Sequence, residues 1–282
     1  MKSMVSRLPS LSVLVATYNR ADYLRISLAC LAAQDYKGDW QIIVADDGST
    51  DHTPVVISEA RSAGKGFEIL HCWHERKNFR KPVILNEGSR RASGDILVFL
   101  DSDCIPARNL LSIYADHFAQ DSFYLGGVYY LTRHISEAAL SNFRSFAPLE
   151  FWAAAVQRRN QKKGTAARNF KRYWKSRFYH ALNFRNPKIW GGNFAVNHNV
   201  FEKINGWNED FAGFNKCDSD IRNRLVKGSY RAKPLHIKAR TYHLYHQVEK
   251  WRTAPQIIDQ SEHPYFKWPD PDIVCKNGLR KL

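Results

Sequence analysis

The first hundred residues alternate between short apolar runs and segments whose apolar residues recur at helical spacing. Nearly continuous apolar runs predict buried strands at residues 11–16, 41–47, 67–72 and 95–101. The three segments between them (22–34, 54–63 and 82–92) have the three- and four-residue spacing of helices. Asp22 is expected to cap the first helix, and Pro82 to lie in the first turn of the third. This alternation predicts an α/β fold with a parallel central sheet and helices on both faces.

The second half of the chain has a less regular pattern. It predicts strands at 126–133, 191–197 and 237–246, and helices at 137–160, near 199–204 and at 218–226. No internal repeat and no clear linker divides the 282 residues, which are enough to bury one large core. We therefore expect one domain over 1–250, made of a regular half (1–105) and an irregular half (106–250), followed by a C-terminal extension at 251–282.

Polar residues follow three of the predicted strands directly. They are Thr17-Tyr18-Asn19-Arg20, Asp46-Asp47-Gly48-Ser49 and Asp101-Ser102-Asp103. In open parallel sheets, ligands bind beyond the carboxyl ends of the strands, and those ends lie at one edge. The three groups should therefore line a single site.

The sequence FLDSD holds two carboxylates close together at a strand end. Asp101 and Asp103 would repel each other, and burying either is costly unless a positive charge lies nearby. A hard cation such as Mg²⁺ or Mn²⁺ prefers these oxygen ligands together with substrate phosphates. Asp46 and Asp47 suit hydrogen bonds to ribose hydroxyls or to a base, although a simple turn and helix cap would use the same residues.

The charge of the chain is strongly basic and unevenly distributed. The formal net charge is +15, and no acidic residue occurs between Glu150 and Glu202. Eleven lysines and arginines, mixed with aromatic residues, lie within 158–188. This basic segment predicts an anionic partner: an acidic or phosphorylated glycan such as a lipopolysaccharide core, an anionic membrane, or nucleic acid. A solvated loop is the simpler alternative. We favour the first two together and expect no nucleic acid.

Composition and cysteine usage indicate a globular protein of a reducing compartment. Apolar residues make up 44% of the chain, and the five cysteines are scattered without the spacing of a metal site. Buried, reduced thiols are therefore expected. The apolar run at 11–16 is too short for a signal peptide or a membrane span. We expect a cytoplasmic protein, either free or bound peripherally to the inner face of the cytoplasmic membrane.

Three motifs in this order and spacing resemble the nucleotide-binding half of family 2 glycosyltransferases with the GT-A fold. They are VLVATYNRADYL, VADDGSTD and FLDSDC. The later segment GGNFAVNHNVFEKINGWNEDFAGFNKCDSDIRNRL resembles the acceptor-side motif of galactosyltransferase-like members. The resemblance implies an inverting, metal-dependent transfer of a sugar from a nucleotide sugar, with a UDP-sugar favoured, to a glycan hydroxyl. It makes 1–105 the nucleotide-binding half and 106–250 the acceptor half.

The resemblance implies a nucleotide pocket at the ends of the first two strands. Thr17, Tyr18 and Arg20 would line this pocket. Asp47 would reach the uracil, with Asp46 nearby.

The diphosphate and its metal would lie at the end of the fourth strand. Arg80 or Lys81 would approach the base or the diphosphate. Asp101 would face the ribose or the metal with Ser102 beside it, and Asp103 would be the main ligand of Mn²⁺ or Mg²⁺.

Later parts of the chain would complete the site. His243 or His246 would supply a further metal ligand, and Gly191, Gly192 and Asn193 would lie against the donor sugar.

The acceptor motif of the family presents Glu-Asp at a helix start, and this chain has Cys217 and Asp218 there. The resemblance implies that Asp218 is the catalytic base, with Asp220 as the alternative. The alternative to a catalytic role is that Asp218 only caps the N-terminus of this helix.

Two other functions are alternatives to this one. A nucleotidyltransferase also has acids after parallel strands, but a Gly-rich phosphate loop is expected where this chain has ATYNR. A nucleic-acid-binding protein would explain the net charge but not the three polar groups at one edge. A nicotinamide dehydrogenase is disfavoured because no G-x-G-x-x-G follows a strand.

Overall fold

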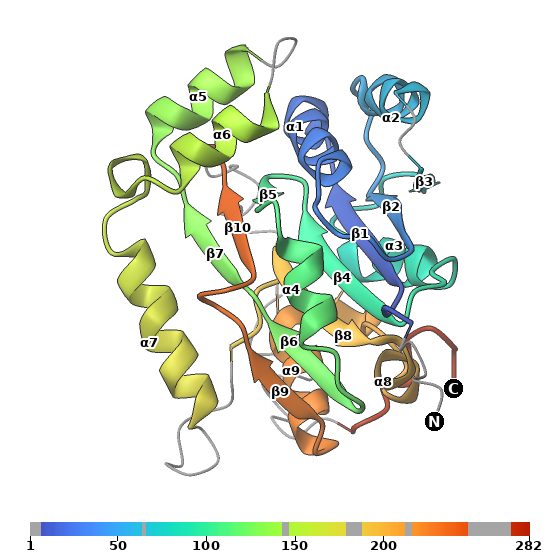
Figure 1. Cartoon of the computed structure of the whole chain (residues 1–282). Helices are drawn as coiled ribbons and strands as arrows, with labels where there is room; N and C mark the ends of the chain where they lie inside the picture. The colour runs from blue at the N-terminus through green and yellow to red at the C-terminus, as the bar shows by residue number, and fades with distance from the viewer. Residues whose placement is uncertain (1–6, 64–65, 143–146, 179–187, 212–215, 248–271) are drawn as a thin grey trace, which may run out of the picture.

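A seven-stranded sheet in the order β3-β2-β1-β4-β8-β6-β9 forms the centre of the molecule, and helices cover both of its faces (Figure 1). The computed structural model of the chain describes residues 7–63, 66–142, 147–178, 188–211, 216–247 and 272–282. The strands of this sheet are β1 (Leu11–Thr17), β2 (Trp40–Asp46), β3 (Glu68–Trp73), β4 (Ile96–Asp101), β6 (Ser122–Leu125), β8 (Asn193–Asn197) and β9 (Arg231–Pro234). Only β8 runs against its neighbours β4 and β6, so the predicted mostly parallel α/β sheet is confirmed.

The four strands predicted in the regular half are all present, in parallel register. Thr17 of β1 pairs with Asp46 of β2, and Ala16 pairs with Asp101 of β4. The carboxyl ends of these strands therefore meet at one edge of the sheet, as the pattern predicted.

Side chains of successive strand residues point to opposite faces of the sheet and join two separate cores. Val13 and Val15 pack with the first core, under α1 (Ala21–Ala32), α2 (Thr53–Ser62) and α4 (Leu110–Asp116). Leu14 and Ala16 pack with the second. Its helices are α3 (Lys81–Ser89), α8 (His198–Lys203) and α9 (Cys217–Lys227).

The predicted cap of the first helix is wrong. Arg20 occupies the N-cap position of α1, and Asp22 lies inside its first turn. A side chain from another loop does the capping, because Asp51 Oδ2 accepts a hydrogen bond from the Ala21 backbone N–H at 3.0 Å. The local pattern could not reveal a cap that comes from thirty residues away.

A second sheet of three strands, in the order β5-β10-β7, was not predicted. Its strands are β5 (Cys104–Pro106), β7 (Gly127–Tyr130) and β10 (Arg240–His243). Residues 122–130 are thus divided between the two sheets: β6, which was not predicted, joins the central sheet, and β7, which lies within the strand expected over 126–133, joins the second. Gly126 separates them, and a Cβ there would lie 2.3 Å from the Asn193 side chain.

The helix predicted over 137–160 is also divided. It consists of α5 (Arg133–Ser141) and α6 (Pro148–Ala155), with Pro148 in the first turn of α6, where a proline is tolerated. A short 3-10 helix (Arg158–Asn160) and α7 (Thr165–Arg177) follow, and a second 3-10 helix spans Glu209–Phe211.

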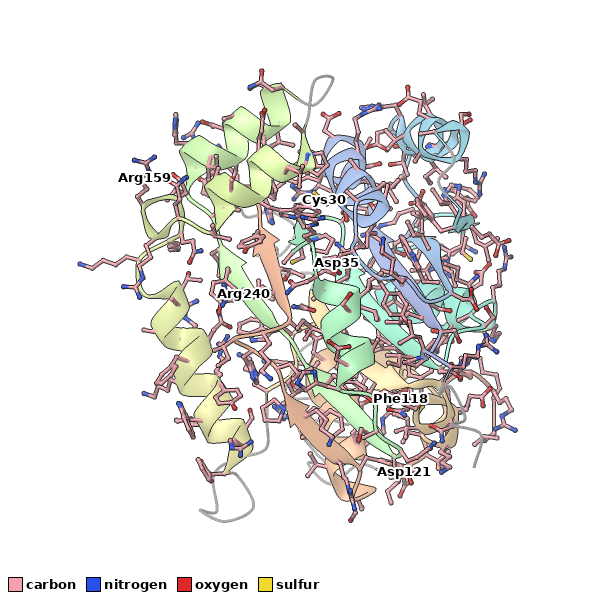
Figure 2. The ribbon with its side chains drawn as sticks, viewed as in Figure 1. Cys30, Asp35, Phe118, Asp121, Arg159 and Arg240 are labelled. Carbon is pink, nitrogen blue, oxygen red and sulfur yellow. The ribbon has the colours of Figure 1, made fainter. Side chains whose placement is uncertain are left out.

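The basic segment therefore contains α7, which lies along the outer side of β7 (Figure 1). Figure 2 shows Arg159, near the start of this segment, pointing away from the fold. Residues 179–187 of the segment, with Tyr179, Phe184 and Arg185, lie outside the described residues.

Most of the predicted extension, 251–271, lies outside the described residues, whereas its last eleven residues pack against the main fold. The Glu209 N–H donates to Asn277 O at 2.8 Å, and the Arg90 guanidinium donates to Leu279 O at 2.7 Å. All five cysteines are buried and unpaired with each other, as predicted. No helix among the described parts of the chain is long and apolar enough to cross a bilayer.

Candidate active site

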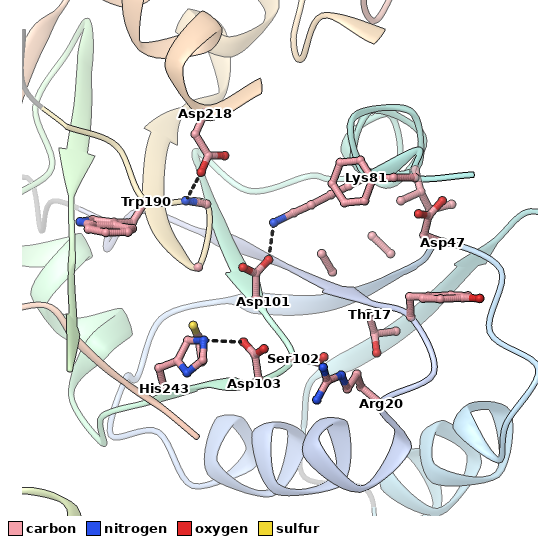
Figure 3. A pocket seen from close by; sticks show the side chains of 18 of the residues that line it. Thr17, Arg20, Asp47, Lys81, Asp101, Ser102, Asp103, Trp190, Asp218 and His243 are labelled. Carbon is pink, nitrogen blue, oxygen red and sulfur yellow. Dashed lines mark hydrogen bonds and ion pairs between the residues drawn. The ribbon is translucent and has the colours of Figure 1, made fainter. Parts of the chain in front are cut away.

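A cavity of about 340 Å³ opens at the carboxyl ends of β1, β2 and β4 (Figure 3). It is closed on its far side by the start of α9, by the turn before β8, and by the end of β10. Twelve of the fifteen residues predicted for the site line it: Thr17, Tyr18, Arg20, Asp47, Lys81, Asp101, Ser102, Asp103, Gly191, Gly192, Asp218 and His243. Of the two alternatives, His246 lines it for the metal, whereas Asp220 does not line it for the base.

The two acids of FLDSD are neutralised by different partners. Lys81, the first residue of α3, forms an ion pair with Asp101 Oδ1 (Figure 3). Burial by itself would lower the pKa of Lys81, but the carboxylates of Asp101 and Asp218 raise it above its usual value. Lys81 is therefore a fixed cation between the strand end and α9.

Asp103 faces two histidines, His243 at the end of β10 and His246 three residues later. His246 Nε2 lies 3.1 Å from Asp103 Oδ2, and His243 Nε2 lies 3.8 Å from Oδ1. Burial would raise the pKa of the Asp103 carboxyl, but the His246 hydrogen bond and the charges of His243, His246 and Arg20 hold it well below its usual range. Asp103 is thus a permanent carboxylate at neutral pH.

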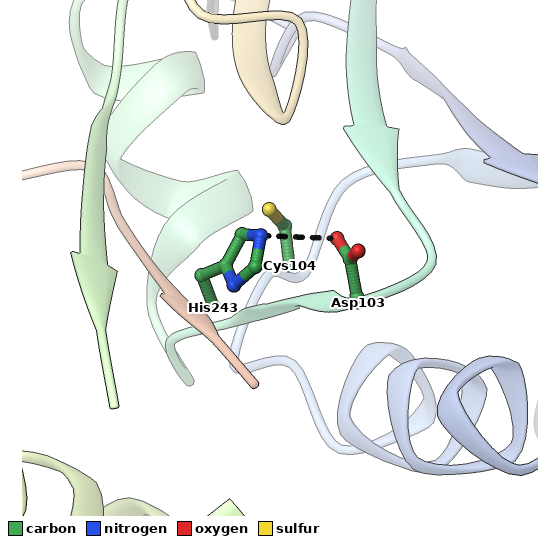
Figure 4. Close-up of side chains that lie close together, drawn as sticks. All are labelled: Asp103, Cys104 and His243. Atoms are coloured by element: carbon green, nitrogen blue, oxygen red, sulfur yellow. Dashed lines mark ion pairs between the residues drawn. The ribbon is translucent and has the colours of Figure 1, made fainter. Parts of the chain in front are cut away.

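These residues fit a divalent cation. Ligand atoms of Asp103, Cys104 and His243 lie within 4.8 Å of one another (Figure 4). Asp103 Oδ1 is buried without a hydrogen-bond partner among the described residues, so it is the oxygen left over for a ligand. His243 is the histidine beside this free oxygen, whereas His246 is already bonded to Oδ2. A carboxylate oxygen with an imidazole suits Mn²⁺ or Mg²⁺ better than the buried thiol does.

A second corner of the cavity is formed by Asp47 and Tyr18. Asp47 Oδ1 pairs with His74 at 2.7 Å, and Oδ2 accepts hydrogen bonds from Arg76 and from the Arg80 backbone N–H. The Arg76 guanidinium lies 3.9 Å from the centre of the Tyr18 ring. The result is a flat, polar wall of the kind that a base and ribose require.

Asp218 lies in the first turn of α9 and points into the cavity (Figure 3). Its Oδ2 accepts a hydrogen bond from the Gly191 N–H at 2.9 Å. A Cβ on Gly191 would lie 2.6 Å from Asp218 Oδ1, and one on Gly192 would lie 2.5 Å from the Cys104 sulfur and 3.3 Å from Asp101 Oδ2. A side chain at Gly191 would therefore displace the Asp218 carboxylate, and one at Gly192 would displace the Cys104 thiol. Burial raises the pKa of Asp218, although Lys81 opposes this effect.

Asp220 is directed away from the cavity and into the core. It forms a buried ion pair with Arg224 at 2.8 Å, and the same guanidinium donates to Ile204 O and Gly206 O, both at 2.8 Å. This arrangement is structural, so the geometry favours Asp218 over Asp220 as a candidate base.

Replacing Arg224 with methionine should destabilise the fold strongly. The variant removes the buried partner of Asp220, and breaking a buried ion pair from one side costs about 3–5 kcal/mol. Equilibrium urea unfolding would measure the loss. A matched control is Arg222→Met on the same helix, whose guanidinium is half-buried and bonds its neighbour Asn223. Equal stability losses in the two variants would contradict the structural role.

Three predicted residues do not line the cavity. Asp46 is fully buried, where it accepts from the Ser49 N–H at 2.8 Å and pairs with His71 at 3.1 Å. Asn193 is buried and bonds Tyr114, Gly127 O and Ala239 O. Arg80 turns its guanidinium toward Glu75 O.

Sequence reasoning also missed residues that do line the cavity, including Arg76, Phe79, Tyr130 and Trp190. The position of Trp190 directly before the predicted Gly191-Gly192 pair was a usable signal. Tyr130 offered none, because it comes from the second sheet.

Comparisons with known proteins agree on one family. The model of glycosyl transferase family 2 matches residues 12–204, and that of the N-terminal domain of galactosyltransferase matches 175–247. A validoxylamine A glucosyltransferase of Streptomyces hygroscopicus subsp. jinggangensis is 30% identical over 232 residues, which are 80% of this chain and 53% of the relative. A chondroitin synthase of Escherichia coli is 26% identical over 227 residues, which are 77% of this chain and 32% of the relative. The chain thus spans about a third to about half of the length of these relatives.

Solved structures share the fold at low sequence identity. The mannosyltransferase PcManGT from Pyrobaculum calidifontis, in complex with GDP-Man and Mn²⁺, has a TM-score of 0.57 and 19% identity. The match covers 86% of this chain and 59% of that one. S. aureus TarS 1–349 in complex with UDP-GlcNAc has the same TM-score and identity, over 87% of this chain and 61% of that one.

Proposed function

Since this chain belongs to glycosyltransferase family 2 and has the GT-A fold, we propose that it transfers a sugar from a nucleotide-sugar donor to a hydroxyl of a glycan. The observation that carries the proposal is a single cavity with Asp103 and His243 on one side and Asp218 on the other. That arrangement suits a donor diphosphate and an acceptor hydroxyl at opposite ends. Membership of this family supports a glycosyltransferase over the alternative of a nucleotidyltransferase.

The nucleotide would bind at the corner formed by Tyr18, Arg76 and Asp47. The Tyr18 ring and the guanidinium above it offer a face to a base, and the anchored Asp47 carboxylate offers acceptors for its N–H edge. We favour a uridine diphosphate donor, because one imide N–H of uracil suits one carboxylate. PcManGT and TarS were solved with GDP-Man and UDP-GlcNAc, so both nucleotides need to be tested.

Asp103 and His243 would hold Mn²⁺ or Mg²⁺, with Asp101 near the ribose or the ion. The ion supplies charge stabilisation for a leaving diphosphate. Lys81 adds a fixed positive charge on the other side of Asp101. Together these groups offset the negative charge that develops on the leaving group.

Asp218 would act as the base of an inverting displacement. Its carboxylate takes the proton of the acceptor hydroxyl while that oxygen forms a bond to the anomeric carbon. The bond from this carbon to the diphosphate oxygen breaks on the opposite side, and the diphosphate leaves with the electron pair. The hydrogen bond from the Gly191 N–H keeps one Asp218 oxygen fixed, so the other can face the acceptor.

A donor screen tests the proposal directly. Purified protein is incubated with UDP- and GDP-sugars, and released nucleotide is measured with Mn²⁺, with Mg²⁺ and after treatment with EDTA. We expect hydrolysis of at least one UDP-sugar, a fall of at least about 100-fold on chelation and recovery when metal is returned, because a bound cation contributes several kcal/mol. Full turnover in EDTA would contradict the metal site, and no turnover of any donor would contradict the function.

The exposed side chains of α7 support a proposal about the acceptor and about where the enzyme acts. We expect an acidic, lipid-linked or cell-surface glycan, such as a lipopolysaccharide core, modified at an anionic membrane surface. The outer face of α7 and the residue after it carry three exposed rings: Phe170 (54% exposed), Trp174 (42%) and Phe178 (39%). The rings of Trp174 and Phe178 are stacked with centroids 5.5 Å apart. Aromatic rings next to lysines and arginines are typical of helices that lie at a membrane interface.

Vesicle flotation measures this docking. With vesicles containing phosphatidylglycerol, Lys171→Gln/Arg177→Gln should bind about 30-fold more weakly, at about 1 kcal/mol for each cation. Trp174→Ser/Phe178→Ser should also lose binding, because the rings no longer enter the interface. Lys37→Gln/Arg108→Gln removes two exposed cations elsewhere and should behave as the parent protein. Unchanged flotation of the α7 variants would exclude the membrane part of the proposal.

A further inference from the structure

The inner face of α7 carries cations that lie beside the cavity. The Arg172 guanidinium lies 4.0 Å from the centre of the Trp190 ring, and Lys188 Nζ lies 4.4 Å from the same centre. Arg168, one turn earlier, lies 5.8 Å from the ring of Tyr130. Both aromatic rings line the cavity, so these three cations, here called the inner cationic cluster, border it.

Two hydrogen-bond donors in this place lack acceptors. Arg172 Nη1 and Trp190 Nε1 are buried and have no hydrogen-bond partner among the described residues. A buried donor left without a partner costs about 1–3 kcal/mol, so such groups are normally satisfied in a working complex. Figure 3 shows the Trp190 indole at the cavity wall, with its nitrogen turned away from Asp218.

The charges of the cluster repel one another. Burial and then Arg168 lower the pKa of Arg172 to about 10. Burial lowers the pKa of Lys188, and Arg172, Arg222 and Lys216 lower it further. The carboxylate of Asp218 opposes this effect on Lys188. An excess of positive charge in a partly desolvated place is relieved by an anion.

The position of the cluster indicates which substrate carries that anion. Trp190 directly precedes Gly191, whose N–H holds the candidate base Asp218. The metal-binding side of the cavity is formed by Asp103, in the turn before β5, and His243 of β10. Arg168 is on that side, because the Tyr130 ring below it lies 4.8 Å from the His243 ring. Arg172 and Lys188, which lie on Trp190, are instead next to the acceptor end, and the donor diphosphate already has cations of its own at Lys81 and the metal site.

We propose that Arg172, Lys188 and the Trp190 indole N–H bind a phosphate or carboxylate group of the acceptor, so that the enzyme selects acidic glycans. This inference rests on the proposed function, because it assigns the acceptor end from the place of Asp218. It explains why α7 is held against β7 by the buried Asn169, whose side chain donates to Val128 O at 2.9 Å. That contact fixes the helix so that Arg172 reaches the cavity wall.

Titration calorimetry tests the proposal on the whole chain with UDP and Mn²⁺ present. The probes are glucose 6-phosphate, glucuronate and glucose, which separate a phosphate from a carboxylate and both from a neutral sugar. We expect binding of at least one acidic sugar and not of glucose. Arg172→Gln and Lys188→Gln should each weaken it about tenfold or more, since a charge-assisted hydrogen bond is lost. Arg108→Gln, which removes an exposed cation outside the basic segment, should have no effect.

Several results would overturn the proposal. They are equal binding of glucose, no binding of either acidic sugar, or unchanged binding in Arg172→Gln and Lys188→Gln. Lys188 is exposed, so Lys188→Gln should fold. This variant therefore tests the proposal even if Arg172→Gln does not fold. UDP affinity, measured in parallel, should stay within about twofold in both variants, and its loss would assign the cluster to the donor. If no sugar nucleotide is hydrolysed by the parent protein, the proposed function fails while the anion measurement still decides on the cluster.

Discussion

Replacing Asp103 with alanine is expected to abolish sugar transfer, with a fall in kcat/KM of at least about 10³-fold. The variant removes the free carboxylate oxygen, the ligand that the metal site cannot replace. Each 1.36 kcal/mol of lost transition-state stabilisation is a factor of ten, and a catalytic cation supplies several kcal/mol. Radiolabel transfer from the donor found in the screen measures the rate.

The binding of UDP separates this effect from misfolding. In Mn²⁺, Asp103→Ala should bind UDP much more weakly than the parent protein, whereas in EDTA the two should bind it alike. Asp116→Ala, an exposed aspartate of α4, is the matched control and should keep both properties. Full activity in Asp103→Ala would refute the metal role of the strand-end acids.

Replacing Asp218 with asparagine should lower kcat by about 10²–10⁴-fold with little change in UDP affinity. The amide still accepts the Gly191 hydrogen bond, so the geometry is kept, but it cannot take a proton. Asp220→Asn is the informative partner variant. It should lower stability through the weakened pair with Arg224 and leave kcat of the folded fraction nearly unchanged. The opposite pattern would identify Asp220 as the base.

The pH dependence follows from the raised pKa of Asp218. A base is active only when deprotonated, so kcat should fall as the pH drops through that pKa. Because burial raises this pKa above the usual aspartate value, the acidic limb should lie at a higher pH than an exposed aspartate would give. The residual kcat of Asp218→Asn should therefore not show this fall at low pH. A limb that persists unchanged in the variant belongs to another group.

The sequence alone was sufficient for the regular half of the fold and for the place of the site. Continuous apolar runs separated by helical spacing determine parallel strands, and parallel strands bring their carboxyl ends together. The positions of Thr17, Asp47, Asp101 and Asp103 on one cavity follow from that rule. The motifs also carried the resemblance to family 2 glycosyltransferases, which the family model and the relatives confirm.

The sequence could not predict the role of a side chain where its partner comes from a distant segment of the chain. The strand-end acids were expected to need a cation between them, yet Asp101 has Lys81 from α3 as its partner, while Asp103 faces histidines 140 and more residues further along the chain. Asp46 has the sequence features of a ligand-binding acid, but its side chain is bonded to Ser49 and His71 in the core.

Only the tertiary structure distinguishes Asp218 from Asp220 and brings Arg172 against Trp190. Two residues on the same helix turn differ in direction, so one faces a cavity and the other a buried arginine. Local periodicity specifies elements and their ends, because it reflects backbone geometry and burial within one segment. Which side chains then share a site depends on how distant segments pack, and that packing is a property of the whole fold.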